Sequence, residues 1–224
     1  MSEEYVSVSD LSLTLGGNDI LKDINITFTK GCIHGLVGRN GSGKTMLMKC
    51  ICGFVKPTAG TIMIDGRVLG KDMDFPDDLG IIIETPGFIS YYNGYKNLEL
   101  LAGINKKISG EDIRKSMENV GLDPDLKRHV SKYSLGMRQR LGLAQAIMED
   151  PGLLVLDEPF NGLDLDGVND FRAYLLNLKK QGKTIIISSH NMDDIKLLCD
   201  DYHRMEKGRL IESKTLQSSD HPAE

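Results

Sequence analysis

A glycine-rich segment, GRNGSGKT at residues 38–45, has the residue types and the spacing that hold phosphate groups. Glycines let the backbone bend so that successive N–H groups point at phosphate oxygens. Lys44 supplies a positive charge for the terminal phosphates, and the Thr45 hydroxyl is a hard oxygen suited to Mg²⁺. A short apolar run precedes the segment and an expected helix follows it, whose positive end adds to the site. We therefore expect a nucleotide to be bound by Gly38, Arg39, Asn40, Gly41, Ser42, Gly43, Lys44 and Thr45. We expect no ligand from the next position, 46.

Two carboxylates and a histidine follow other apolar runs, where they could act on the phosphates. The run LLVLDEP at residues 153–159 ends in Asp157 and Glu158. In a doubly wound sheet, Asp157 would lie beside the glycine loop and hold Mg²⁺ through water. Glu158, on the other side of the pleat, would polarise the water that attacks the γ-phosphate. His190 would donate a hydrogen bond to that phosphate or to the water. The predicted catalytic residues are Glu158, His190 and Lys44, and the predicted metal ligands of this pattern are Thr45 and Asp157.

A second helix start that could hold an anion lies in KYSLGMRQR, residues 132–140. Ser134 and Gly136 stand at its beginning, and two arginines follow within one turn. A serine hydroxyl and the positive end of a helix suit a phosphate oxygen. The same serine could instead serve only as the cap of the helix expected at 135–149.

The order of the expected elements places these residues in an α/β fold. Alternating apolar and polar residues predict strands in the first third of the chain, and apolar stripes predict helices in the middle. Ser109 with Asp112 predicts a capped helix that Gly121 ends. Solid apolar strands between amphipathic helices indicate a mostly parallel sheet covered on both faces. In the last third we expect strands at 153–157 and 184–188 and helices at 167–180 and 191–200.

Composition limits the classes of protein that this chain can represent. Its 224 residues fit one domain, with an expected core over 1–87 and 149–212, a helical insert at about 88–148 and a polar tail at 213–224. A net charge of −5 argues against a nucleic-acid partner, which usually requires a basic face. The sequence has no run of apolar residues long enough to span a membrane, and its start lacks the apolar segment of a secretory signal. The four cysteines lack the paired spacing of a metal site, which favours small buried thiols.

These motifs together closely resemble those of the ATP-binding subunits of ABC transporters, over about residues 5–210. SLGMRQ at 134–139 resembles the signature motif of that family, NGLD at 161–164 resembles its D-loop, and His190 matches its H-loop. The resemblance implies a P-loop NTPase of ABC type, with a mostly parallel sheet flanked by helices, an N-terminal antiparallel β subdomain and a helical subdomain insert. It also implies a head-to-tail dimer, in which each signature helix closes on the ATP of the partner. Ser134, Gly136 and Asp164 are the nucleotide contacts that it adds.

The chain departs from the family pattern at several positions. Leu135 and Met137 replace the small residues usual around Gly136. Glu84 stands in the Q-loop position, where glutamine is usual, and YSLGMRQRLGLA and LDEPFNGLD are similar to segments of bacitracin-type and lantibiotic-immunity exporters. The resemblance implies that Glu84 senses Mg²⁺ or the attacking water, although it could be only a tolerated loop carboxylate. Leu15 occupies the place of the aromatic residue that usually stacks on adenine, and it offers apolar contact without a π-face.

The function implied by the resemblance is ATP hydrolysis that drives export, with ATP and Mg²⁺ as cofactors. The expected partners are a second copy of the chain and separate transmembrane permease subunits, with no nucleic acid. The expected location is cytoplasmic, peripheral on the inner face of the membrane through the permease. Export of a peptide antibiotic follows only from the subgroup analogy. Two alternatives are an ABC-type ATPase that works on ribosomes or DNA, and a subunit that binds ATP without turnover.

Overall fold

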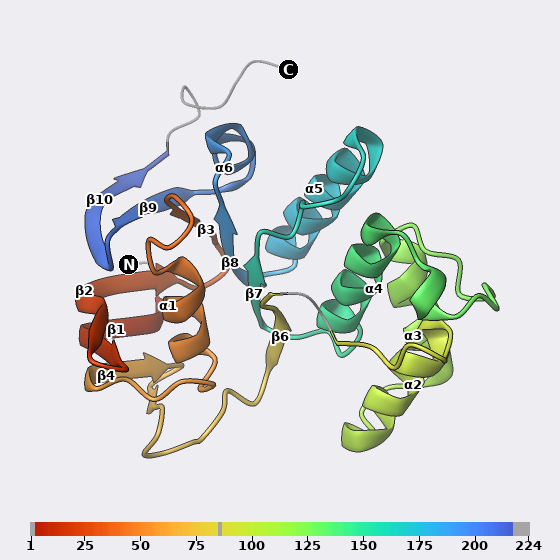
Figure 1. Ribbon diagram of the computed structural model, residues 1–224, viewed down its shortest axis with the longest axis horizontal. Helices are drawn as coiled ribbons and strands as arrows, with labels where there is room; N and C mark the ends of the chain where they lie inside the picture. The colour runs from red at the N-terminus through yellow and green to blue at the C-terminus, as the bar shows by residue number, and fades with distance from the viewer. Residues whose placement is uncertain (1–2, 85–86, 217–224) are drawn as a thin grey trace.

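The N-terminal part of the chain forms an antiparallel sheet. The computed structural model describes residues 3–84 and 87–216 (Figure 1). The strand order in this sheet is β2-β1-β4-β5. Long β1 and β2 alternate buried and exposed residues, because one face of the sheet packs on the core. The strands are β1 (Glu4–Leu15), β2 (Asn18–Thr29), β4 (Ala59–Ile64) and β5 (Arg67–Val68).

A second sheet has six strands in the order β10-β9-β3-β8-β7-β6. Four of the five pairings are parallel: β9 with β3, β3 with β8, β8 with β7 and β7 with β6. The edge strand β10 pairs antiparallel with β9. The strands are β3 (Ile33–Val37), β6 (Leu79–Ile82), β7 (Leu153–Asp157), β8 (Thr184–Ser189), β9 (Asp201–Glu206) and β10 (Arg209–Thr215). The expected mostly parallel sheet and N-terminal antiparallel subdomain are confirmed.

Helices cover the six-stranded sheet and build the helical insert. The helices are α1 (Lys44–Ile51), α2 (Gly94–Asn105), α3 (Gly110–Asn119), α4 (Leu135–Ile147), α5 (Leu165–Lys180) and α6 (Met192–Leu198), with a 3₁₀ turn at Val130–Lys132. The predicted capping box is present, since Ser109 Oγ accepts from Asp112 N and the Asp112 carboxylate accepts from Ser109 N. Helix α5 begins two residues earlier than expected, because the Asp164 carboxylate accepts from Gly167 N and caps it.

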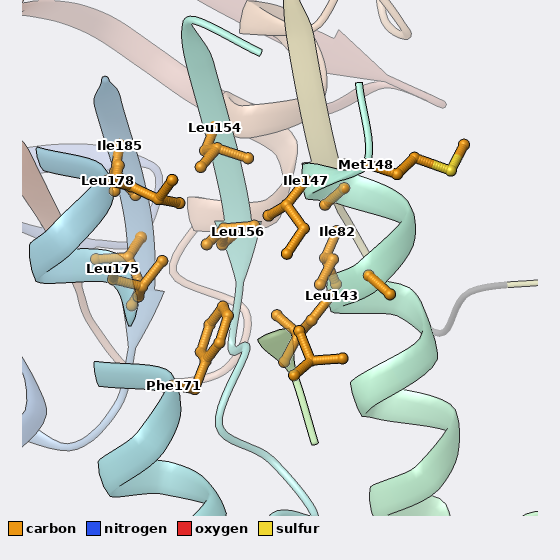
Figure 2. Packing of buried hydrophobic residues seen from close by; sticks show 14 of the residues in the cluster. Ile82, Leu143, Ile147, Met148, Leu154, Leu156, Phe171, Leu175, Leu178 and Ile185 are labelled. Carbon is orange, nitrogen blue, oxygen red and sulfur yellow. The ribbon is translucent and has the colours of Figure 1, made fainter. Parts of the chain in front are cut away.

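Alternate residues of the buried strands enter two separate apolar clusters. Leu153 and Val155 of β7 pack with α1 and the antiparallel sheet, whereas Leu154 and Leu156 pack with the helices of the other face. Figure 2 shows this second face, where side chains from α5, including Phe171, and from α4 meet those of β7. Helices α1 and α4 therefore lie on opposite faces of the six-stranded sheet (Figure 1).

The carboxyl-terminal region differs from the sequence expectation. Residues 201–206 and 209–215 form the hairpin β9–β10, and β10 continues into the segment expected to be a polar tail. The rest of that tail, 217–224, lies outside the described residues. The sequence did not predict the hairpin, because two of its inward-facing positions carry polar residues, Asp201 and His203, instead of apolar ones.

The cysteines are small core residues, as the composition suggested. Cys50, Cys52 and Cys199 are buried, and Cys32 is half-buried. Burial raises the pKa of Cys50 to about 11. Burial, together with the neighbouring Cys50, raises the pKa of Cys52 to about 12. Both thiols therefore stay protonated and unreactive at neutral pH.

Candidate nucleotide-binding site

The predicted phosphate-binding, carboxylate and histidine positions meet at one edge of the six-stranded sheet. The strands β3, β8 and β7 are adjacent and parallel, so their carboxyl ends lie together. The glycine-rich loop follows β3, Asp157 ends β7, and His190 follows β8. Ligands of open α/β sheets bind at this edge, outside the carboxyl ends of the strands.

The glycine-rich loop needs glycine at two of its positions. Gly43, the residue before α1, has φ 108°, a left-handed conformation that other residues adopt only with strain. At Gly38 a Cβ atom would lie 2.5 Å from the carbonyl oxygen of Met205, which belongs to β9. The loop is therefore folded tightly against the β9–β10 hairpin.

Lys44 lies at the base of the loop and is held in place by two oxygen groups. Its side chain is only 6% exposed. Its Nζ donates to the Gly38 carbonyl oxygen at 2.7 Å and lies 3.9 Å from Glu158 Oε1. The lysine charge is thus already placed between the loop and the predicted general base.

The position after Thr45 supplies no further hydroxyl to the site. That position is occupied by Met46. The Met46 side chain is half-buried and packs against the apolar cluster that α1 shares with the antiparallel sheet. Its thioether is a soft, weak acceptor, whereas Mg²⁺ and phosphate groups require hard oxygens or N–H donors. The predicted series of loop ligands therefore ends at Thr45.

A chain of hydrogen bonds joins the predicted metal ligands to Glu158. Thr45 Oγ1 donates to Asp157 Oδ2 at 2.6 Å. Ser188 Oγ donates to the other Asp157 oxygen and accepts from the Glu158 backbone N–H at 2.9 Å. The sequence did not single out Ser188, which stands directly after the apolar run of β8 and is fully buried. Its hydroxyl links the Asp157 carboxylate to the backbone of Glu158, the predicted general base.

Glu158 and His190 form a pair at the mouth of the site. His190 Nδ1 lies 2.8 Å from Glu158 Oε2. Glu158 has φ 48°, a left-handed conformation that is uncommon outside glycine, asparagine and aspartate. Its other oxygen, Oε1, is buried and makes no hydrogen bond within the described residues. That unsatisfied acceptor is aimed at Lys44 and is suited to a water molecule.

A cavity of about 690 Å³ opens beside the loop, large enough for a nucleotide-sized ligand. Its wall combines the loop, His190 and the β9–β10 hairpin, and the charged members of that wall are Arg39, Arg204, Glu206, Lys207 and Glu212. The predicted adenine contact, Leu15, is 44% exposed at the end of β1 and is not among the described residues that line the cavity. The hairpin side of the cavity was not anticipated from the sequence.

The residues present fit a magnesium–nucleotide complex. The hydroxyl of Thr45 and the carboxylate of Asp157 supply adjacent hard oxygens, the donor type that Mg²⁺ prefers. The hydroxyl of Ser42 is buried without a hydrogen-bond partner among the described residues, and a Cβ on Gly41 would meet nothing within 4 Å. A cation, phosphate oxygens and a water would satisfy the open groups of this loop.

Comparison with known proteins agrees with this geometry. The sequence profile of the family described as ABC transporter matches residues 21–161. The ABC transporter ATP-binding protein YybJ of Bacillus subtilis, itself uncharacterized, is 46% identical over 93% of this chain and 96% of its own length. The chain belongs to the ABC transporter family. It is an ATP-binding subunit of that family.

Two further relatives carry names that match the resemblance seen in the motifs. The bacitracin transport ATP-binding protein BcrA of Enterococcus faecalis is 42% identical over 95% of this chain and 70% of its own length. The lantibiotic transport ATP-binding protein SrtF of Streptococcus pyogenes is 34% identical over 96% of this chain and 93% of its own length. A solved structure of an ATP-binding subunit of an ABC transporter superposes with a TM-score of 0.85 at 26% identity, over 95% of this chain and 90% of that one.

In this ABC subunit, the signature segment begins helix α4. Ser134 caps that helix, since its Oγ accepts from Met137 N at 3.2 Å. A Cβ on Gly136 would lie 2.7 Å from the carbonyl oxygen of Gly162 in the D-loop. Asp164 caps α5 and pairs with Arg140 of α4 at 3.1 Å. The signature and the D-loop of one chain are thus packed together as one unit.

Glu84, the residue at the Q-loop position, is engaged by a lysine. Lys49 Nζ of α1 donates to Glu84 Oε1 at 2.6 Å, and the Glu84 side chain is 63% exposed. The backbone of Glu84 has φ 61°, and the next two residues lie outside the described part of the chain. The structure brings together the glycine loop, Asp157, Glu158 and His190, while Glu84, Ser134, Gly136 and Asp164 have other partners. Their contacts with nucleotide or metal stay predictions.

Proposed function

We propose that this ATP-binding subunit hydrolyses ATP and powers export of a peptide antibiotic or another drug through separate transmembrane subunits. ATP is held between two copies of the chain in a head-to-tail dimer. The relatives named for bacitracin and lantibiotic transport support the substrate class. None of the helices in residues 3–84 and 87–216 has both the length and the hydropathy of a bilayer-crossing segment. The proposal includes a membrane-spanning partner, which holds this chain on the inner face of the membrane.

One observation supports the proposed head-to-tail dimer. Helix α1, which follows the glycine loop, and helix α4, which the signature segment begins, pack on opposite faces of the same sheet (Figure 1). Two helix starts that suit phosphate are thereby separated within one chain. A second copy, turned head to tail, supplies Ser134 and Gly136 to the nucleotide of the first.

The described side chains support an in-line attack of water on the γ-phosphate. Glu158 orients the water and accepts its proton, with Oε1 as the open acceptor and His190 fixing the other oxygen at 2.8 Å. Lys44 exchanges its contact with the Gly38 carbonyl for phosphate oxygens and balances their charge. Thr45 and Asp157 would hold Mg²⁺, which when bound neutralises charge that develops on the phosphates. Positioning and charge are the main demands of this reaction.

Replacement of Glu158 by glutamine tests the catalytic part of the proposal. The amide keeps the size of the side chain but cannot accept the proton, so turnover is expected to fall by about a hundredfold or more. ATP binding should persist, and ATP should trap a dimer detectable by size-exclusion chromatography. Turnover near that of the unaltered chain would show that Glu158 is not the base.

A mixed dimer tests whether the site is shared. One copy carries Lys44→Ala, which disables its glycine loop, and the other carries Gly136→Asp, which places a negative charge in its signature. If the signature acts across the dimer, both defects fall in one of the two composite sites and the other site stays intact. The mixture should then recover activity that neither variant shows alone. No recovery from a mixture in which both variants are shown by circular dichroism to be folded would indicate that the signature acts within its own chain.

A further inference from the structure

Two buried histidines and an aspartate lie together away from the nucleotide site. Among the described residues, His34, Asp201 and His203 are the group whose potential metal-binding atoms all lie within 4.8 Å of one another. Strand pairing puts them together: His34 of β3 lies opposite Asp201 of β9, and His203 follows two residues later on the same face of β9. His34 is fully buried, and His203 is 8% exposed.

The distances within the group suit coordination of one ion. His34 Nδ1 lies 2.9 Å from Asp201 Oδ1, and His203 Nε2 lies 3.3 Å from the same oxygen. In a tetrahedral zinc site, with bonds of about 2.0–2.1 Å, neighbouring ligand atoms are about 3.3 Å apart. Imidazole nitrogen and carboxylate oxygen are ligands that Zn²⁺ accepts.

The outer nitrogen of each histidine is already anchored. His34 Nε2 lies 2.9 Å from the carbonyl oxygen of Thr29, and His203 Nδ1 lies 2.9 Å from Ser213 Oγ of β10. Histidines that bind metals almost always have such an oxygen partner on the nitrogen that faces away from the ion. This leaves His34 Nδ1 and His203 Nε2 facing inward, toward Asp201.

One inward atom lacks a partner that satisfies it. His203 Nε2 is buried and makes no hydrogen bond within the described residues. It lies 3.3 Å from Asp201 Oδ1, which is close enough for an ion pair. A buried polar atom without a partner carries a cost, which a bound ion would remove. The aromatic ring of Phe28 closes the group from the antiparallel sheet, with its centroid 5.2 Å from that of His34 and 5.6 Å from that of His203.

We propose that His34 Nδ1, the Asp201 carboxylate and His203 Nε2 form a binding site for a divalent transition metal of the zinc type. Asp201, with a side chain 21% exposed, is the side of the group that is open to solvent. A water from that side would be the fourth ligand. The ion joins β3, which leads into the glycine loop, to the β9–β10 hairpin, which lines the nucleotide cavity. The site is structural: it fixes the hairpin against the core.

The test uses the whole chain, stripped of metal by a chelator and free of nucleotide. Zn²⁺ is titrated by calorimetry into the unaltered chain and into His203→Gln and Asp201→Asn variants. The exposed histidine variant His129→Gln is the matched control, and His190→Gln excludes binding at the nucleotide site. We expect one Zn²⁺ per chain and a raised melting temperature for the unaltered chain and both control variants. Affinity should fall at least about a hundredfold in the two ligand variants, since loss of a supporting outer contact alone costs about 10–100-fold.

The visible spectrum of Co²⁺ bound to the unaltered chain decides the matter even if a ligand variant does not fold. Intense bands of tetrahedral cobalt without a sulfur charge-transfer band are expected from two imidazoles and a carboxylate. Three results would overturn the proposal. The first is the absence of Zn²⁺ binding to the unaltered chain, which would leave His34 and Asp201 as a plain ion pair. The second is a folded His203→Gln variant that binds Zn²⁺ as tightly as the unaltered chain. The third is a cobalt spectrum typical of thiolate ligands or of octahedral coordination.

Discussion

Ser188 joins two residues of the proposed catalytic site through its hydroxyl. One hydroxyl serves two neighbours, because it donates to the Asp157 carboxylate and accepts from the Glu158 backbone N–H. Glu158 in turn holds a left-handed backbone conformation with φ 48°. A backbone in such a conformation persists only when its surroundings determine it, and this hydrogen bond is one of those determinants.

Replacement of Ser188 by alanine is therefore expected to slow ATP turnover. Loss of a buried partner leaves groups unsatisfied at a cost of about 1–3 kcal/mol, which corresponds to about a 5- to 150-fold loss of rate if it is expressed in the transition state. Nucleotide binding should change little, because the glycine loop is untouched. Ser116→Ala is the matched control, since that buried hydroxyl donates only to the Ile113 carbonyl of its own helix. Equal turnover in the two variants would contradict the role of Ser188.

At the scale of elements, the contact between the signature helix and the D-loop sets a strict limit on side-chain size. Gly136 lies in the first turn of α4, against the Gly162 carbonyl oxygen. Arg140, one turn on, binds both the Val120 carbonyl oxygen and Asp164. The start of α4 and the start of α5 are therefore joined by direct contacts.

Gly136→Ala should destabilise the chain, because the new Cβ would meet a backbone oxygen at 2.7 Å. Overpacking of this kind costs about 1–3 kcal/mol. Gly103→Ala is the control: it is also helical, nothing lies within 4 Å of its added Cβ, and alanine favours a helix by about 0.5–1 kcal/mol. Urea unfolding of both variants measures the difference. A Gly136→Ala chain as stable as Gly103→Ala would contradict the close approach.

The sequence predicted the elements whose apolar pattern is regular and missed those whose pattern is broken. Strand β7 was expected at residues 153–157 and lies there, because every position before Asp157 is apolar. The β9–β10 hairpin was missed because Asp201 and His203 point inward. Motif spacing gave the glycine loop, Asp157 and Glu158. It could not give Ser188 or the hairpin wall of the cavity, which depend on strands that are adjacent in space only.

At the scale of the whole molecule, the arrangement predicts an activity that depends on association. Helices α1 and α4, which follow the glycine loop and begin in the signature, pack on opposite sheet faces. In the proposed function a single copy therefore holds only part of the site. The specific rate of ATP hydrolysis, per mole of chain, should fall as the protein is diluted below the dissociation constant of its ATP-bound dimer. Assays over a dilution series, paired with analytical ultracentrifugation, measure both quantities. A constant specific rate from a chain that sediments as a monomer would refute the shared site.

Strand β10 forms the outer edge of the six-stranded sheet, and its charged side chains include Arg209, Glu212 and Lys214. A border of this kind discourages strand addition from another molecule, because a new strand would have to desolvate those charges. Fibril-like growth of the sheet is thereby disfavoured at that border.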